Sequence, residues 1–178
     1  MRVCLAFILF LCVSLSNGGC GYALAGRGTF LPDYIETIGI PLFVNDTTFF
    51  ELEEVITDHV RTEFIGRGRY KVMAEETDVD ALLTGSILNI SVVPSGFTAD
   101  RMVSRYTATV TSKIEFRDLT NGVILWENPG LVFSEEYDVT NVASGQDPGA
   151  FFGQNINALE RLANNFARSV VTSILEAF

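Results

Sequence analysis

Residues 106–116, YTATVTSKIEF, alternate strictly between two kinds of side chain. The even positions are mostly apolar, whereas the odd positions are threonine, lysine and glutamate. Because successive side chains of a strand point to opposite faces, this pattern predicts a β-strand with one buried and one wetter face. Asn121-Gly122 then predicts a tight turn into a returning strand over 123–137, interrupted at 128–130. These features favour a largely antiparallel sheet.

Two segments carry apolar side chains three or four residues apart, which is the spacing of an amphipathic helix. In the first, Thr48 and Glu51 have the spacing of a capping box, so the helix is expected to begin near Thr48 and to stop at Gly66. Its apolar stripe consists of Leu52, Val55, Ile56, Val60 and Phe64. The stripe of the C-terminal helix consists of Phe152, Ile156, Leu159, Ala163, Phe166, Val170 and Ile174.

The remaining apolar segments are expected to form strands. Residues 37–44, TIGIPLFV, alternate, and Pro41 within them requires an open edge or a bulge because it has no amide hydrogen. Gly85 is expected at a second bulge. Further strands are predicted over 70–73 and 81–93, and loops over 94–101 and 142–150. The expected fold is a two-layer α/β (α+β) sandwich, with two helices on one face of a mostly antiparallel sheet of about four strands.

The N-terminal segment MRVCLAFILFLCVSL has one basic residue followed by an apolar run too short to span a bilayer. It is typical of a signal peptide over residues 1–19. Cys20 is then the lone cysteine of what remains, and Gly18-Gly19-Cys20 resembles the cleavage site of bacterial lipoproteins, although Asn17 stands where an aliphatic residue is usual. We expect lipid on Cys20, a leader over 20–33 and a single domain over 34–178.

The composition excludes several classes of function. The chain has 12 Lys+Arg against 22 Asp+Glu, so it is not a general nucleic-acid binder. His59 is the only histidine and is expected to be a partly covered surface residue, which leaves no cluster with the usual spacing of zinc ligands. No phosphate-binding loop or nucleophile elbow is present. We therefore expect no enzyme, no metal and no cofactor apart from the covalent lipid.

The candidate binding residues are cations in this acidic chain. They either contact phosphate or carboxylate groups of a ligand or balance neighbouring acids and a helix dipole. The stronger candidates are Arg101, Arg105 and Lys113, and the weaker ones are Arg67, Arg69 and Lys71.

Several segments together resemble the LptE family of lipopolysaccharide-assembly lipoproteins. They are the start Cys20-Gly21-Tyr22, the strand 35–43 (IETIGIPLF), the segment 66–72 (GRGRYKV) and the strand 81–87 (ALLTGSI). The resemblance covers nearly the whole chain after the signal peptide. It implies two helices on a mostly four-stranded sheet, in agreement with the expectation from the residues.

The resemblance also implies a non-catalytic role. Members of the family plug the β-barrel LptD in the outer membrane, help it to fold and bind lipopolysaccharide on its way to the cell surface. An anchored outer-membrane location, an LptD-like partner and lipopolysaccharide as ligand are therefore expected, and Gly21 is compatible with outer-membrane sorting. The alternative is a lipoprotein cofactor or activator of a cell-envelope enzyme, which would predict a longer tether. A hydrolase with an unrecognised site is a third, remote alternative.

Overall fold

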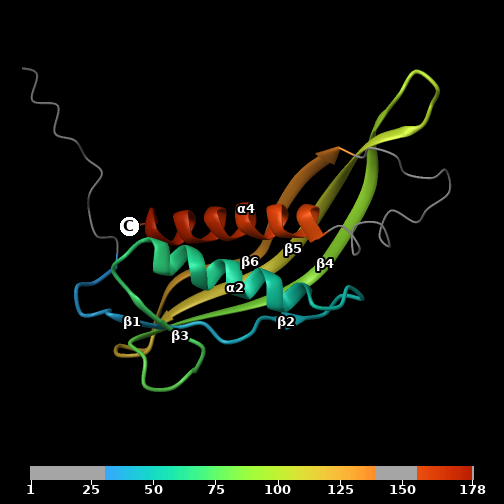
Figure 1. The fold of residues 1–178 in the computed structure, drawn as a ribbon. Coiled ribbons are helices and arrows are strands. Elements are labelled where there is room, and N and C mark those ends of the chain that lie inside the picture. Colours follow the sequence, from blue (N-terminus) through green and yellow to red (C-terminus); the bar gives the residue numbers. More distant parts are fainter. Residues whose placement is uncertain (1–30, 139–155, 178) are drawn as a thin grey trace, which may run out of the picture.

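The computed structural model describes residues 31–138 and 156–177, and all structural statements below refer to these residues. A sheet and two helices form two layers (Figure 1). The strands are β1 (Thr37–Gly39), β2 (Val44–Asn45), β3 (Lys71–Met73), β4 (Ala81–Phe97), β5 (Val103–Asp118) and β6 (Val123–Asp138). The helices are α2 (Leu52–Gly66) and α4 (Ile156–Leu175).

The sheet has six strands rather than about four. Most of its paired residues are antiparallel, as expected, and its short strands add parallel pairs. Its order is β3-β1-β4-β5-β6, with β2 also paired to β4. The three long strands are antiparallel neighbours, whereas β1 pairs in parallel with β3 and β4, and β2 pairs in parallel with β4. The segments 37–44 and 70–73 were both expected to be strands, but 37–44 forms two short strands, β1 and β2, instead of one, and all three short strands join the same sheet.

The alternation over 106–116 is confirmed within β5. Its even-numbered side chains are buried under the helices, and its odd-numbered ones face the other way and are half-buried or exposed. The turn at Asn121-Gly122 is also confirmed, and Gly122 has a φ of 69°, which favours glycine. The returning strand β6 continues through 128–130, where a register shift against β5 replaces the expected interruption.

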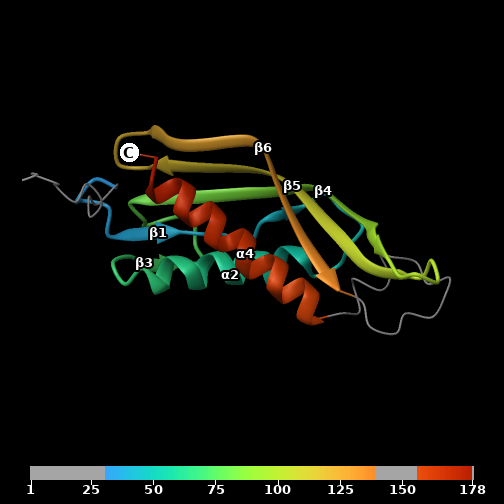
Figure 2. The ribbon, with the colours of Figure 1, turned by 90° about the horizontal axis from the view of Figure 1, so that it is seen from above.

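Both helices lie on the same face of the sheet, as expected (Figures 1 and 2). Each directs its apolar stripe at the sheet. The buried members of the expected stripes are Leu52, Ile56, Val60 and Phe64 of α2 and Ala163, Phe166, Val170 and Ile174 of α4, and Leu162 and Val171 of α4 are buried in addition. Phe64 packs against Phe116 of β5 with ring centroids 6.3 Å apart, so the core extends from helix to sheet. Phe152 lies outside the described residues. His59 is half-buried on α2, as expected.

The segment 37–44 is divided at Pro41 into β1 and β2. Ile40 is buried, but Val44 beyond the break is 56% exposed, so the expected alternation ends at the proline. Side chains of α2 satisfy the backbone groups freed by the break: the Arg61 Nε donates to the carbonyl oxygen of Ile40 at 2.9 Å, and the Phe43 amide donates to the buried Thr57 hydroxyl at 3.1 Å. This replacement lets the strand stop without leaving buried polar groups unpaired.

The expected capping box at Thr48 and Glu51 is wrong. Helix α2 begins at Leu52, and Glu51 before it has a φ of 64° and makes no side-chain cap. The connection to β2 is organised by Asn45 instead, whose Oδ1 accepts the Thr47 amide at 2.9 Å and whose Nδ2 donates to the Phe49 carbonyl oxygen at 2.7 Å. A local turn of this kind competes with helix initiation. The end of the helix at Gly66 is confirmed.

The bulge expected at Gly85 lies elsewhere, between Ile87 and Asn89, where the register of β4 against β5 shifts. Gly85 has a different role, because a Cβ built on it would lie 2.5 Å from the ring of Phe43. The loop expected over 94–101 is also shorter than predicted. Strand β4 runs on to Phe97 through further register shifts, so the long hairpin β4–β5 turns only at residues 98–102.

Two carboxylates bind backbone and side-chain donors at one end of the sheet. Asp80 accepts the amides of Glu36 and Thr37 at 3.0 and 2.8 Å and the Thr37 hydroxyl at 2.7 Å. The Thr37 hydroxyl above all, with the two amides, holds the pKa of Asp80 below its usual value. Burial raises the pKa of Asp118, but hydrogen bonds from Tyr34, Asn121 and Thr120 outweigh it and hold that pKa below its usual value.

We expect Asp80 to make the stability of the fold dependent on pH. Because its folded-state pKa is lowered, ionised Asp80 stabilises the fold above an unfolded-state pKa of about 3.9, and this contribution is lost as the pH falls through the folded-state pKa. Asp80→Asn should therefore lower the urea midpoint at pH 7, and the difference from wild type should close below about pH 4. Urea unfolding from pH 7 to pH 2, with exposed Asp46→Asn as control, measures this; a difference independent of pH would contradict it.

Candidate functional site

The face of the sheet opposite the helices is not covered by any element of the described part of the chain (Figure 2). We call this surface the open face and define it by residues of β4, β5 and β6 that point away from the helices: Leu88, Val93, Thr107, Thr109, Thr111, Val132 and Ser134. Three of its apolar side chains are strongly exposed, Leu88 at 41%, Val93 at 51% and Val132 at 62%. Because singly exposed apolar side chains are ordinary on a protein surface, the candidate site rests on the sheet face that both helices leave uncovered within the described residues.

Hydroxyl groups separate these apolar side chains. Thr107, Thr109 and Thr111 follow one another along β5, and the Thr109 and Ser134 hydroxyls hydrogen-bond across to β6 at 2.9 Å. Threonine suits such a surface because its branched side chain packs on a pleated sheet and still offers a donor and an acceptor. The open face can therefore pack against and hydrogen-bond to a partner that is itself polar.

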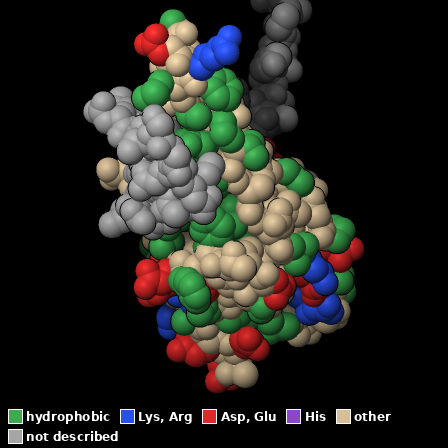
Figure 3. Space-filling model, turned by 90° about the vertical axis from the view of Figure 1, so that its right-hand side faces the viewer, with side chains coloured by type: hydrophobic (Ala, Val, Ile, Leu, Met, Phe, Trp, Pro, Cys, Tyr) green, Lys and Arg blue, Asp and Glu red, His purple; other side chains and the backbone are tan. Residues whose placement is uncertain are grey.

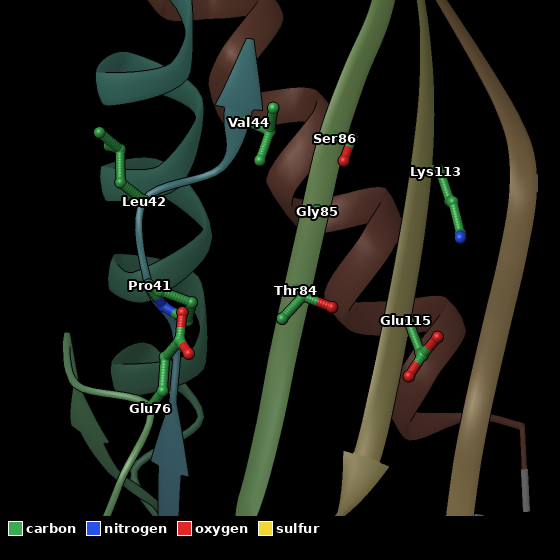
Figure 4. Close-up of a pocket in the computed structure, with 9 residues that line it drawn as sticks. All are labelled: Pro41, Leu42, Val44, Glu76, Thr84, Gly85, Ser86, Lys113 and Glu115. Carbon is green, nitrogen blue, oxygen red and sulfur yellow. The ribbon is translucent and has the colours of Figure 1, made fainter.

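A groove opens on the same side of the sheet where the strand divides at Pro41 (Figure 4). Its volume is about 170 Å³. Leu42 and Val44 line one wall, Thr84 and Ser86 of β4 form the floor, and Lys113, Glu115 and Glu76 contribute the charges. Glu115 is held by Arg117 at 2.6 Å, and no ion pair joins Lys113 to a carboxylate within the described residues. The groove therefore combines one available ammonium with acidic and hydroxyl groups rather than a concentrated positive charge.

The three stronger candidate cations do not form one cluster. Arg101 lies in the turn of the β4–β5 hairpin, whereas Arg105 and Lys113 both lie on the outward side of β5. Eight residues of strand separate Arg105 from Lys113, which corresponds to roughly 26 Å. A single headgroup cannot touch all three, so they belong to different parts of the surface.

Arg105 is the one of the three that forms ion pairs within the described chain. Its Nε donates to Asp138 at 3.1 Å, and its Nη1 lies 3.5 Å from Glu136, both on β6. The Asp138 carboxylate chiefly raises the pKa of the guanidinium, with help from Glu136. Arg105 therefore joins β5 to β6 and is less available to a ligand than Arg101 and Lys113.

The weaker candidates are spread over the helical layer and the sheet edge. Arg67 bonds Glu63 at 2.8 Å and the Thr172 hydroxyl of α4 at 2.9 Å, and Arg69 bonds Asp33 at 3.0 Å. Lys71 on β3 lines a shallow cavity beside Arg69. The two arginines balance neighbouring acids, which was the alternative interpretation of this group. Cys20 lies outside the described residues.

A family model described as lipopolysaccharide assembly, LptE, matches residues 35–174. The chain belongs to the LptE family. The match covers α2, the six strands, the open face and α4 up to its last residue but one. No curated protein matches the sequence significantly.

Solved structures resemble this LptE-family chain at low sequence identity. A hypothetical protein from Chlamydia trachomatis has a TM-score of 0.52 at 6% identity, covering 81% of this chain and 99% of its own, which is a likeness of fold alone. A putative lipoprotein from Caulobacter crescentus has a TM-score of 0.44 at 15% identity, covering 78% and 87%. Rare lipoprotein B from Shewanella oneidensis has a TM-score of 0.41 at 12% identity, covering 80% and 92%.

Within the part of the LptE-family chain that the structure describes, no group of His, Cys, Asp and Glu side chains could hold a metal ion. No described helix is long and apolar enough to cross a membrane. Sequence reasoning identified cations but missed the open face and the groove. The alternating threonines of β5 were the available signal for the open face, whereas the groove depends on the division of the first strand at Pro41.

Proposed function

We propose that this chain is a lipid-anchored outer-membrane subunit that lies within an LptD-type β-barrel, assists its assembly and takes part in lipopolysaccharide transport to the cell surface. Membership of the LptE family supports the role in lipopolysaccharide assembly. The proposal extends this to a barrel partner, a lipid on Cys20 and contact with lipopolysaccharide through its cations.

The observation that carries the proposal is the open face. Within the described residues, a sheet with three strands of 16 or 17 residues keeps one face free of helices. Hydroxyls and short aliphatic groups line the middle of this face, and charged side chains such as Arg105, Lys113 and Glu136 lie on the same side. The interior wall of a transmembrane barrel is polar, and its side chains alternate along each strand. Such a wall can exchange hydrogen bonds with the threonines and pack against the aliphatic groups between them.

Arg101 and Lys113 are the proposed contacts to lipopolysaccharide. Both are exposed, and neither forms an ion pair within the described chain. Their side chains can bind phosphate, the guanidinium through two parallel hydrogen bonds and the ammonium as a point charge. Arg105, which is held by Glu136 and Asp138, is expected to contribute less.

The proposal is tested by purifying the tagged full-length protein from solubilised outer membranes. We expect a large integral β-barrel protein to remain bound in equal amount through stringent washing, with lipopolysaccharide in the same fraction. Recovery of the protein alone would contradict the proposal.

A further inference from the structure

The β4–β5 hairpin extends well beyond the helical layer (Figure 1). Strand β4 has 17 residues and α4 has 20, which corresponds to roughly 56 Å of strand against roughly 30 Å of helix. The hairpin therefore cannot be covered along its whole length by α4. We call residues 97–102, where it turns, the hairpin tip.

The hairpin tip presents large apolar side chains to solvent. Phe97 is 63% exposed and Met102 is 46% exposed, and Val93, four residues before Phe97 on β4, is 51% exposed. Figure 3 shows hydrophobic side chains along this projecting part, with a cation and an acid beside them at its end. The exposed Phe97 and Met102 side chains do not belong to the hydrophobic core of this fold.

Arg101 occupies a strained position in the same turn. Its φ is 60°, in the left-handed region that glycine adopts without strain and that other residues adopt at about 1 kcal/mol or more. The turn is closed by hydrogen bonds from the Arg101 amide to the Thr98 carbonyl oxygen at 2.9 Å and from the Thr98 amide to that of Met102 at 2.8 Å. Glycine at this position would relieve the strain but would remove the guanidinium from the hairpin tip.

We propose that the hairpin tip inserts into the surface of a phospholipid bilayer. The Phe97 ring and the Met102 side chain enter the boundary between headgroups and acyl chains, and the Arg101 guanidinium binds lipid phosphates just above them. An aromatic wedge at this depth is characteristic of proteins that lie on a membrane. This contact lies beyond the part of the open face proposed to meet the barrel, and it gives Arg101 a phospholipid phosphate as its partner in place of the lipopolysaccharide contact proposed above.

The shape and charge of the tip favour a bilayer over a protein groove. A hairpin end is narrow, so it can enter a soft surface without a complementary pocket. The chain as a whole carries a net charge of −10, and at the tip only Asp100 adds a negative charge next to Arg101. Repulsion from lipid phosphates therefore keeps the acidic body away and directs the tip, rather than a flat face, to the membrane.

The test places a fluorescent reporter at the tip. The chain from Cys20 onward retains every described residue and has one thiol, which is coupled to a maleimide lipid in vesicles of phosphatidylethanolamine and phosphatidylglycerol. In a Trp126→Phe background, Phe97→Trp is compared with Phe50→Trp, a matched control because Phe50 is 93% exposed but lies before α2. Emission wavelength and quenching by brominated acyl chains report insertion.

We expect the Phe97→Trp emission to shift to shorter wavelength and to be quenched, and the Phe50→Trp emission to stay unchanged. Adding Arg101→Gly should raise the unfolding midpoint, because it relieves strain. The same change should lower the ratio of inserted to free hairpin tip about tenfold, because the guanidinium no longer binds lipid phosphate. Opposite changes in stability and insertion separate a role in lipid binding from a structural one.

Three results would overturn the proposal. They are equal quenching at both positions, no quenching at either, and quenching of Phe97→Trp only when the vesicles contain lipopolysaccharide. The last result would assign the tip to the ligand of the proposed function instead. Loss of the barrel partner in the purification described above would leave this test unaffected.

Discussion

Phe64→Ala is expected to destabilise the fold by about 3–5 kcal/mol. The side chain is fully buried, stacks on Phe116 of β5 and meets the edge of the Tyr70 ring, with ring centroids 6.3 and 6.4 Å apart. Its removal takes away apolar contact and leaves a cavity where α2 joins the sheet. Because domains of this size are stable by about 5–15 kcal/mol, the variant should lose a large part of its stability.

The matched control is Ile65→Ala, one residue further along the same helix. Ile65 is 58% exposed, so its truncation should change the free energy of unfolding by about 0.5 kcal/mol or less. Guanidinium unfolding of both purified variants, followed by circular dichroism, gives the comparison. Similar midpoints for the two variants would mean that α2 does not pack on the sheet through this side chain.

The second large effect concerns the open face. Thr109→Glu combined with Val132→Glu places two carboxylates among its hydroxyl and aliphatic side chains. If this surface is buried against a barrel wall, each unpaired charge should cost several kcal/mol, so recovery of the barrel with the tagged protein should fall more than about 100-fold. The fold should survive, because both side chains point away from the core.

Ser173→Glu is the matched control for this double variant. Ser173 is exposed on α4, in the layer on the other side of the sheet. The same change there should leave the recovery of the barrel unchanged. Equal loss from both variants would point to a general effect on abundance, and full recovery with the double variant would place the barrel contact elsewhere.

The long elements of this fold could be predicted from the sequence because each repeats its pattern many times. The alternation of β5 and the stripes of α2 and α4 are examples, and they also predicted the two layers. The short strands lie in segments that were predicted as strands, but the division of the first segment at Pro41 and the parallel pairing could not be predicted in this way. The division depends on Thr57 and Arg61 of α2, which bond to backbone groups on either side of Pro41.

The candidate site was only partly predictable for a similar reason. Charge and position identified Arg101 and Arg105, but only the structure shows that Arg105 is held by β6 while Arg101 lies in a strained turn. Arg105 and Lys113 lie an even number of residues apart on one strand, which predicts that they share a face. The same spacing was not used to predict that the two cations would contact different ligands. The open face itself becomes visible only when both helices are seen on the opposite side.

The most direct test of the account is photo-crosslinking from the open face in living cells. A photoreactive phenylalanine analogue would replace Thr109 and, separately, Ser173, in an otherwise unchanged full-length chain. We predict that Thr109 crosslinks to an integral outer-membrane β-barrel protein and that Ser173 gives a much weaker product or none. Crosslinking to such a barrel from Ser173 but not from Thr109, or from neither position, would contradict the proposal that the open face is the docking surface.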